Sequence, residues 1–256
     1  MTLPLSLTSL DIYQAHRHIL HIDNVSVQRG EFIAVLGPNG AGKTSLFRAI
    51  TTEWPARAGT ILLHGRDIHH WSRRERAQHL GVLPQATQLT FPFSAREVVE
   101  IGAIPLHLPK MQLTQQLRQW MKKTDTWQFA DRLYTSLSGG ERQRVQLARV
   151  LLQLSQAEMS PLLLLDEPTS AQDLGQQHHV LQLVRQLSQE QHFSVVAILH
   201  DLNQAARYAD NIWILNQGKL VAQGAPHDIL TPTMVQSVWD YLPEQLSTHN
   251  GYPVLI

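Results

Sequence analysis

The stretch FIAVLGPNGAGKTSLFRAI, residues 32–50, decides the fold. Its first part, Phe32 to Leu36, is continuously apolar, which is typical of a central strand buried on both faces. Residues 37–44 match the pattern G-x-x-x-x-G-K-[ST] at each fixed position, and Thr44 to Ile50 then reads as a helix. A buried strand, a glycine loop and a helix in this order form the context that a phosphate-binding loop requires.

The residue types of this loop fit a nucleotide triphosphate. Glycines let backbone N–H groups turn towards the phosphates, and the helix that follows adds the positive end of its dipole. Lys43 is predicted to reach the β- and γ-phosphates, and the Thr44 hydroxyl is predicted to ligate Mg²⁺. The loop therefore predicts a nucleoside triphosphate and Mg²⁺ as ligands.

A second apolar strand, Leu162 to Leu165, ends in two carboxylates. Asp166 lies at the carboxyl end of this strand, where it would hold Mg²⁺ directly or through water. Glu167 follows it and would polarise the attacking water as a general base. An Asp-Glu pair could also simply end a strand. Its functional interpretation therefore depends on the glycine loop and on the segment Leu137 to Glu141.

The third motif is Leu137-Ser138-Gly139-Gly140-Glu141. Ser138 and Glu141 have the spacing of a capping box, so the segment predicts the start of a helix. Exposed glycine amides at a helix N-terminus also form an anion site. A plain helix cap accounts for the same residues, and both interpretations can hold together.

Composition excludes several classes of protein. The chain has 43% hydrophobic and 16% charged residues, which is ordinary for a folded protein, and it has no cysteine for disulfides or thiolate metal sites. Its 21 basic and 21 acidic residues argue against a general electrostatic grip on nucleic acid. The start lacks the pattern of a signal peptide, and the apolar runs are far shorter than the roughly 20 residues of a membrane helix. We therefore expect a chain that spans no membrane, so that a transport function would need a separate pore.

The three motifs in this order resemble the ATP-binding cassette (ABC) ATPases, the motors of membrane transporters. The resemblance runs from Tyr13 to about Asp240, and it implies an α/β P-loop NTPase core with an antiparallel β subdomain and a helical subdomain insertion. We expect one ABC ATPase domain over residues 1–256. Residues 1–85 and 161–256 would form the RecA-like catalytic core with the β subdomain, and residues 86–160 the helical subdomain. Short strands expected at Val25 to Gln28 and Thr60 to Leu63, and a hairpin around Asn216-Gln217-Gly218, fit this division.

The resemblance also assigns roles to residues outside the three motifs. Gln85 matches the glutamine that touches Mg²⁺ or water and senses the membrane partner, and His200 matches the switch histidine that contacts the γ-phosphate. Asp173 matches the residue that couples the two sites of a dimer, whereas Gln172 stands where the family usually has an apolar residue. The implied ATP contacts are Tyr13, which stacks on adenine, and Gly37, Pro38, Asn39, Gly40, Ala41, Gly42, Lys43, Thr44 and Ser45. The implied metal ligands are Thr44, Gln85 and Asp166; the implied catalytic residues are Glu167 and His200.

The family resemblance implies a homodimer that sandwiches two ATP molecules. In such a dimer the signature residues Ser138, Gly139, Gly140 and Glu141 contact the γ-phosphate bound by the other copy, and the reaction converts ATP and water into ADP and phosphate. We expect a 2:2 complex with permease subunits on the cytoplasmic face of the bacterial inner membrane, and no nucleic-acid partner.

Within the family, two stretches resemble importers of iron chelates, haem and cobalamin: Phe91-Pro92-Phe93-Ser94 and the extension from Val150 to Pro161. They favour haem (hemin) import with an indirect periplasmic haem-binding partner. A siderophore or cobalamin importer is the alternative, and a cassette ATPase of translation or DNA repair is the alternative of another class.

The chain has fourteen histidines, including the adjacent pairs His69-His70 and His178-His179. Neighbouring residues of a helix or strand do not share a face, and neither pair has a cluster of carboxylates beside it. We therefore expect these pairs to be solvated polar residues and not metal or haem ligands.

Overall fold

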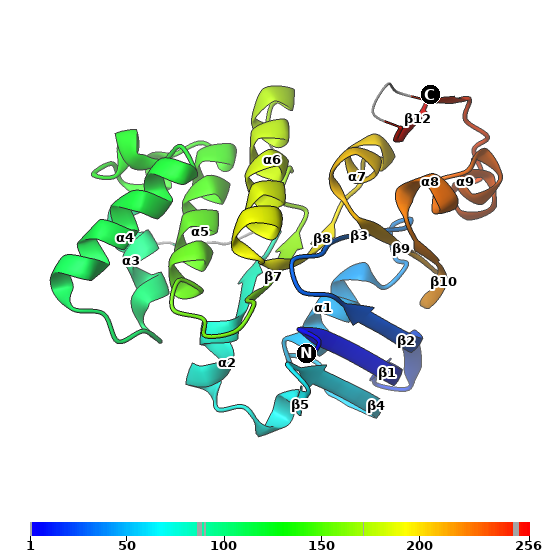
Figure 1. The fold of residues 1–256 in the computed structure, drawn as a ribbon, viewed down its shortest axis with the longest axis horizontal. Helices are drawn as coiled ribbons and strands as arrows, with labels where there is room; N and C mark the ends of the chain where they lie inside the picture. The colour runs from blue at the N-terminus through cyan, green and yellow to red at the C-terminus, as the bar shows by residue number, and fades with distance from the viewer. Residues whose placement is uncertain (1, 86–88, 90, 171, 248–250) are drawn as a thin grey trace.

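A ten-stranded sheet runs through the whole molecule in the computed structural model, which describes residues 2–85, 89, 91–170, 172–247 and 251–256. Its strand order is β5-β4-β1-β2-β10-β9-β3-β8-β7-β6 (Figure 1). The strands are β1 (Leu5–Gln14), β2 (Arg17–Val27), β3 (Phe32–Leu36), β4 (Ala56–Leu63), β5 (Arg66–Asp67), β6 (Leu80–Leu83), β7 (Leu162–Asp166), β8 (Ser194–Ile198), β9 (Asn211–Asn216) and β10 (Lys219–Gly224), with β11 (Gln245–Ser247) and β12 (Pro253–Leu255) forming a separate pair.

Helices lie on both sides of this sheet (Figure 1). They are α1 (Lys43–Ile50), α2 (Arg73–His79), α3 (Ala95–Glu100), α4 (Lys110–Lys123), α5 (Gly139–Gln153), α6 (Leu174–Gln191), α7 (Leu202–Tyr208), α8 (Pro226–Ile229) and α9 (Pro232–Trp239). Short 3₁₀ turns occupy Ile68–His70, Ile101–Ala103, Trp127–Phe129 and Tyr134–Ser136.

The sheet has a parallel half and an antiparallel half. Strands β9, β3, β8, β7 and β6 are parallel neighbours, whereas β1 pairs antiparallel with both β2 and β4. The halves join where β10 pairs with β2 at Lys219 and His21. This arrangement confirms the predicted α/β fold with an antiparallel β region, because parallel strands with helices on both faces are typical of a P-loop core.

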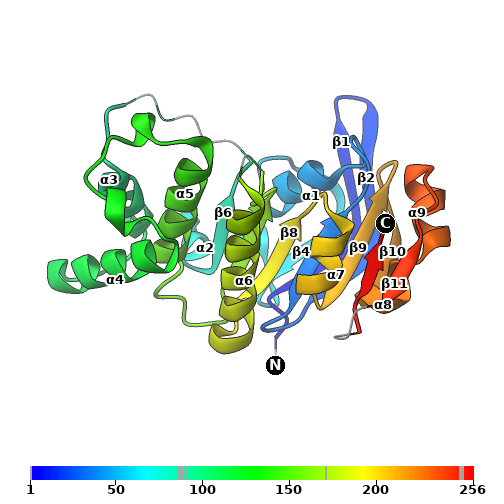
Figure 2. The same cartoon turned by 90° about the horizontal axis from the view of Figure 1, so that it is seen from above.

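Two hydrophobic cores flank the parallel strands, and successive residues of β3 alternate between them. Phe32 and Ala34 belong to the core under α3 to α7, and Ile33 and Val35 belong to the core that includes α1 and the antiparallel strands. Side chains of a strand alternate in this way because successive residues point to opposite faces. Figure 2 shows α6 and α7 lying along the sheet and α3 to α5 beyond its β6 edge. Burial on both sides explains the uninterrupted apolar sequence of residues 32–36.

Strand β1 and the first half of β2 are elements that the sequence analysis did not predict. Leu5 and Leu7 are buried, and so are Leu10 and Ile12, so the alternation slips by one residue between the two pairs. The slip lies at Ser9, whose φ is 48°, and the register with β4 shifts there. A bulge of this kind breaks the two-residue period by which strands are recognised.

The predicted hairpin after β9 is confirmed, and it lies against the phosphate-binding loop. Gln217 and Gly218 both have positive φ, 47° and 76°, as a two-residue type I′ turn requires. A side chain at Gly218 would meet the carbonyl of Ile19 at 2.4 Å, so glycine is needed here. The N–H of Gly218 donates to the carbonyl of Ala41 at 3.1 Å, which ties the turn to the loop.

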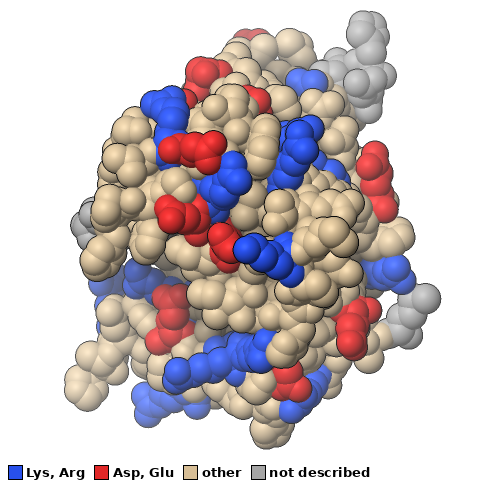
Figure 3. All heavy atoms as spheres, turned by 90° about the vertical axis from the view of Figure 1, so that its left-hand side faces the viewer, with Lys and Arg blue, Asp and Glu red and all other residues tan. Residues whose placement is uncertain are grey.

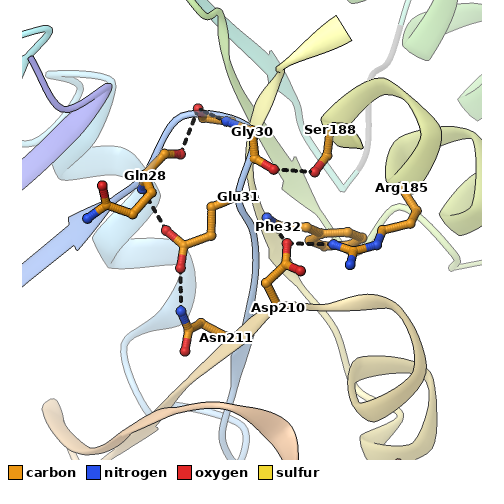
Figure 4. A network of polar contacts seen from close by, with 9 residues as sticks. Gln28, Gly30, Glu31, Phe32, Arg185, Ser188, Asp210 and Asn211 are labelled. Atoms are coloured by element: carbon orange, nitrogen blue, oxygen red, sulfur yellow. Dashed lines mark hydrogen bonds and ion pairs between the residues drawn. The ribbon is translucent and has the colours of Figure 1, made fainter. Parts of the chain in front are cut away.

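A polar network holds the start of β3 (Figure 4). Asp210 accepts a hydrogen bond from the N–H of Phe32 at 2.9 Å and is ion-paired with Arg185 of α6. Next to it, Glu31 accepts from the N–H of Gln28 at 2.6 Å, and Ser188 donates to the carbonyl of Gly30 at 2.7 Å. These contacts fix one end of β3, so that its other end presents the glycine loop in a defined position.

The region of α3, α4 and α5 packs as a helical layer beyond β6, and both predicted capping boxes are present at its helix starts, Ser94 and Ser138. Figure 3 shows this side of the molecule with basic and acidic side chains interspersed. The predicted boundary at residue 86 lies outside the described residues, and the division into subdomains stays a prediction.

Candidate nucleotide site

The glycine loop leaves β3 through Gly37 and enters α1 at Lys43. Gly37 has a φ of 147°, and a side chain there would lie 2.1 Å from the carbonyl oxygen of Leu215. The strand-to-loop turn therefore needs glycine. Pro38 is half-buried and Ala41 is buried, whereas Asn39 and Gly40 are exposed at the tip of the loop. At the start of α1, Thr44 is exposed and Ser45 is half-buried.

Lys43 is buried and folds back over the loop. Its Nζ donates to the carbonyl oxygens of Gly37 at 2.7 Å and Pro38 at 3.0 Å. Burial lowers the pKa of the ammonium, and the nearby carboxylates Glu167 and Asp166 oppose this shift. The loop therefore holds a buried cation against its own backbone carbonyls.

Asp166 is a buried carboxyl at the end of β7. Burial raises its pKa to about 6, and the neighbouring charge of Glu167 acts in the same direction. Its Oδ1 is buried and has no hydrogen-bond partner among the described residues. A buried carboxylate oxygen without a partner is costly unless something else binds to it.

A cavity of about 300 Å³ joins Asp166 to two other predicted metal ligands, Thr44 and Gln85. Carboxylate, hydroxyl and amide oxygens are the donors that Mg²⁺ prefers. The structure thus brings the three residues to one place. The unpartnered oxygen of Asp166 and this donor set fit the Mg²⁺ ion that the sequence predicts.

Glu167 is the centre of a polar cluster. Its Oε1 lies 2.6 Å from Nε2 of His200, which follows β8, and its Oε2 accepts from the side-chain amide of Gln85 at 2.6 Å. The backbone of Glu167 has a φ of 53°, an uncommon conformation for a residue other than glycine, and such conformations cluster at functional sites. The predicted base, switch histidine and sensing glutamine thus meet within hydrogen-bond distance.

Two glutamines link this cluster to the rest of the chain: Gln143, which the sequence analysis did not name, and Gln172, which it named only as a departure from the family pattern. Gln143 of α5 donates to the carbonyl of Glu167 at 2.9 Å. Gln172 donates to the side chain of Gln143 at 2.8 Å and to the carbonyl of Pro168 at 2.9 Å. Gln172 thus uses its polarity inside its own chain.

The signature helix end is exposed. Ser138 accepts from the N–H of Glu141 at 3.2 Å, and Glu141 accepts from the N–H of Ser138 at 2.7 Å. This bond from the Ser138 N–H lowers the pKa of Glu141. Ser138 and Gly139 are exposed, and Gly140 is buried. The capping interpretation is therefore confirmed, while the first residues of α5 still face outwards as an anion site requires.

Tyr13 and Asp173 lie at the ends of other elements. Tyr13 is half-buried at the end of β1, with the ring of His18 4.8 Å from its own and the Arg57 guanidinium 4.8 Å above it. Asp173 is exposed and caps α6 by accepting from the N–H of Gln176 at 2.9 Å. The structure thus gives Asp173 a capping contact in its own chain.

Comparison with known proteins identifies the family. The family described as ABC transporter matches residues 20–170, which include the glycine loop, the signature and the Asp166-Glu167 pair. The chain belongs to the ABC transporter family. The chain is thus an ABC ATPase, which binds and hydrolyses ATP.

Named relatives resemble this ABC ATPase over nearly its whole length. It is 48% identical to the hemin import ATP-binding protein HmuV of Vibrio cholerae serotype O1, over 90% of this chain and 88% of that protein. The HmuV of Shewanella denitrificans is 43% identical over 98% of this chain and 99% of its own.

Solved structures support the fold. A chain assigned to the metal-chelate type of ABC transporters, in an inward-facing conformation, has a TM-score of 0.81 at 28% identity, with 99% of this chain and 98% of that chain covered. A dimeric ATP-binding cassette, MJ0796, bound to ADP and Pi has a TM-score of 0.73 at 25% identity, with 86% of this chain and 98% of that chain covered. In the described part of this ABC ATPase, no helix is long and apolar enough to cross a membrane.

Proposed function

We propose that this chain is the ATP-hydrolysing subunit of a bacterial importer that takes haem (hemin) across the cytoplasmic membrane. The observation that carries the cargo is the 42–48% identity to several proteins named as hemin import ATP-binding proteins, over most of both chains. The polar cluster around Glu167 carries the motor function, because it joins a candidate base to the residues that would orient it.

The residues of this chain divide the work of hydrolysis between them. Lys43 and the loop amides hold the phosphates, and Tyr13 stacks on the adenine. Glu167 takes a proton from the attacking water, while His200, 2.6 Å from the Glu167 carboxylate, orients that carboxylate and contacts the γ-phosphate. Thr44, Asp166 and Gln85 hold Mg²⁺, which when bound neutralises charge on the β- and γ-phosphates.

The signature end of α5 completes the site of a second copy. Ser138, Gly139, Gly140 and Glu141 supply a helix N-terminus whose exposed start can face the γ-phosphate bound by the partner. Asp173 lies at the start of α6, where it would contact the partner. We therefore propose a homodimer with two ATP molecules between the copies, in line with the dimeric form of the MJ0796 cassette.

The homodimer would dock on two permease subunits at the cytoplasmic face of the inner membrane. Two exposed aromatics precede α3: Phe91 is 66% exposed and Phe93 is 37% exposed, and their ring centroids lie 6.2 Å apart. This exposure excludes a core role for Phe91, and it supports an apolar contact with a permease. A periplasmic haem-binding protein would act on the other side of the membrane, without touching this chain.

Reconstitution with its permease tests the cargo. The chain and the permease are placed in liposomes with the ATPase facing outwards and the binding protein enclosed in the lumen, which then corresponds to the periplasm. ATP hydrolysis should be faster when the enclosed binding protein carries haem than when it is empty. A gene deletion should prevent growth on haem as the sole iron source and spare the use of ferrous iron. Growth on haem by the deletion strain, together with failed siderophore or cobalamin uptake, would overturn the cargo and keep the motor. The likeness to a metal-chelate type ABC transporter makes that alternative the second candidate.

A further inference from the structure

Three side chains of the β1–β2 hairpin converge beside Tyr13, with the His18 ring 4.8 Å from the Tyr13 ring: Asp11, His18 and His21. Asp11 Oδ1 lies 2.9 Å from Nε2 of His18 and 2.9 Å from Nδ1 of His21. The three potential ligand atoms all lie within 4.8 Å of one another. In the described ranges of the chain, no other three histidine, aspartate or glutamate side chains come together in this way.

The convergence is built into the hairpin by a bulge. Asp11 is directly opposite His21 in the register of β1 and β2, so the two share a face. His18 is three residues before His21, and a regular strand would place it on the opposite face. The register shift leaves Ile19 as an extra residue of β2, which returns His18 to the face of His21.

A fourth residue, Asp23, gives His21 the hydrogen-bond partner that a metal-binding histidine usually has. The other ring nitrogen of His21, Nε2, lies 2.9 Å from Oδ1 of Asp23. Metal-bound histidines usually donate their second N–H to a carboxylate, which fixes the tautomer and leaves the first nitrogen free to bind the metal. Asp23 can therefore orient His21 with Nδ1 towards Asp11 and His18.

We propose that Asp11, His18 and His21 form a binding site for a divalent transition-metal ion of the Zn²⁺ class, with water completing the coordination. Two imidazoles and one carboxylate are a ligand set that suits Zn²⁺, and Mg²⁺ prefers oxygen donors, so this site differs from the one near Asp166. The side chains of Asp11, His18 and His21 are 28%, 41% and 33% exposed, which leaves an open position for water.

Two of the three spacings between ligand atoms need little change to accept the ion. Ligand atoms about 2.0 Å from a tetrahedral Zn²⁺ lie about 3.3 Å apart. Both imidazole nitrogens lie 2.9 Å from Asp11 Oδ1, so each would move away from it by about 0.4 Å as the ion replaces the bridging protons. The two nitrogens lie within 4.8 Å of each other, and rotation of the exposed His18 ring would bring them to about 3.3 Å. A simple hydrogen-bonded trio shows the same distances without metal, and a metal titration separates the two accounts.

The first experiment measures metal binding by the purified full chain. After EDTA treatment and dialysis, Zn²⁺ is titrated by calorimetry in the presence of excess Mg²⁺, and Co²⁺ is followed by its d–d absorption. We expect one tight Zn²⁺ equivalent and a four-coordinate Co²⁺ spectrum. The variants His18→Gln and His21→Gln should bind at least about tenfold more weakly, and Asp23→Asn about tenfold more weakly. His16→Gln, an exposed histidine of the same hairpin, should bind as the parental chain does.

The second measurement needs no variant, so it does not depend on how a substituted chain folds. Imidazole ¹⁵N resonances of the parental chain are followed as Zn²⁺ is added, and His18 and His21 should shift within the first equivalent, ahead of the other histidines. Equal Zn²⁺ affinity in the His18, His21 and His16 variants would overturn the proposal. A first equivalent that moves other histidines first would overturn it as well.

Discussion

This cassette has two surfaces that we propose bind phosphate, and they differ in how many contacts their own chain makes to their side chains. At the ends of β3 and β7, Lys43 and Glu167 are held by contacts from the glycine loop, Gln85 and His200. At the start of α5, Ser138 and Glu141 bond to each other and the first residues are exposed. The side chains of the first, prepared surface are held by contacts within the monomer, and we propose that the second, exposed surface acts on a ligand that another copy brings.

The largest effect is expected at the prepared surface, from Glu167→Gln. The amide keeps the shape of the side chain and loses the basicity that activates water, so turnover should fall by about 10²–10⁴-fold. ATP binding should remain, and an ATP-bound dimer should accumulate because opening follows hydrolysis. Phosphate release and size-exclusion chromatography with ATP measure the two effects, with the exposed Glu158→Gln as the matched control. Turnover near the parental rate would show that Glu167 is not the base.

The second prediction concerns the exposed surface, where Gly139→Leu should separate binding from turnover. ATP affinity of the monomer should be unchanged, because the signature contacts no nucleotide of its own chain. Turnover should fall about 10²-fold, as when donors to a transition-state oxyanion are removed. Fluorescent nucleotide titration and steady-state turnover measure the two quantities. A loss of monomer ATP affinity would show that the signature serves its own nucleotide.

A mixing experiment sharpens the same test. Lys43→Ala should weaken nucleotide binding itself, since it removes the cation that the loop holds over the phosphates. A mixed dimer of Lys43→Ala and Gly139→Leu chains contains one composite site with both surfaces intact. Turnover by the mixture above the sum of the separate variants would support two surfaces contributed by different copies. Unchanged ATP affinity of Lys43→Ala would contradict the assignment of the loop.

The third prediction uses the buried carboxyl at the prepared surface. The pKa of Asp166 is raised from 3.8 to about 6, so the folded chain holds this proton more tightly than the unfolded chain does. Its contribution to stability is therefore present below pH 3.8 and is lost as the pH rises through about 6. Without Mg²⁺, Asp166→Asn should raise the free energy of unfolding by about 2 kcal/mol at pH 8, and by little near pH 4.

Urea unfolding in EDTA at pH 8, 6 and 4 checks this prediction, with the exposed Asp131→Asn as a control. Addition of Mg²⁺ should stabilise the parental chain more than it stabilises Asp166→Asn, because a neutral amide oxygen binds the ion more weakly than a carboxylate does. A variant that is less stable than the parental chain at pH 8 would show that burial of the charged Asp166 carboxylate does not destabilise the fold.

The comparison also shows which parts of the site could be predicted from sequence. The glycine loop and Asp166 were predictable, because each is a local segment whose residue types follow from phosphate or metal chemistry. Strand β1 was not, because the bulge at Ser9 shifts its apolar residues out of period. The contact of Gln143 with Glu167 and that of Gln172 with Gln143 were not either, since these partners are distant in sequence and glutamine has no chemistry that marks it. The cluster of Asp11, His18 and His21 was missed for both reasons, since it needs a bulge and two strands.

The smallest effects are expected at the link between the two surfaces, where Gln143→Leu and Gln172→Leu should differ. Gln143 bonds directly to the carbonyl of Glu167, so its loss leaves that carbonyl without this donor and should slow turnover about tenfold.

Gln172 bonds to Gln143 and to the carbonyl of Pro168, and its own Oε1 is buried without a partner in the described chain. Replacing it removes two hydrogen bonds of about 1 kcal/mol each and also removes that unpartnered acceptor, so the costs largely cancel. Turnover by Gln172→Leu should stay within about threefold of the parental rate. If instead Gln172→Leu slows turnover as much as Gln143→Leu, position 172 acts across the dimer and not within its own chain.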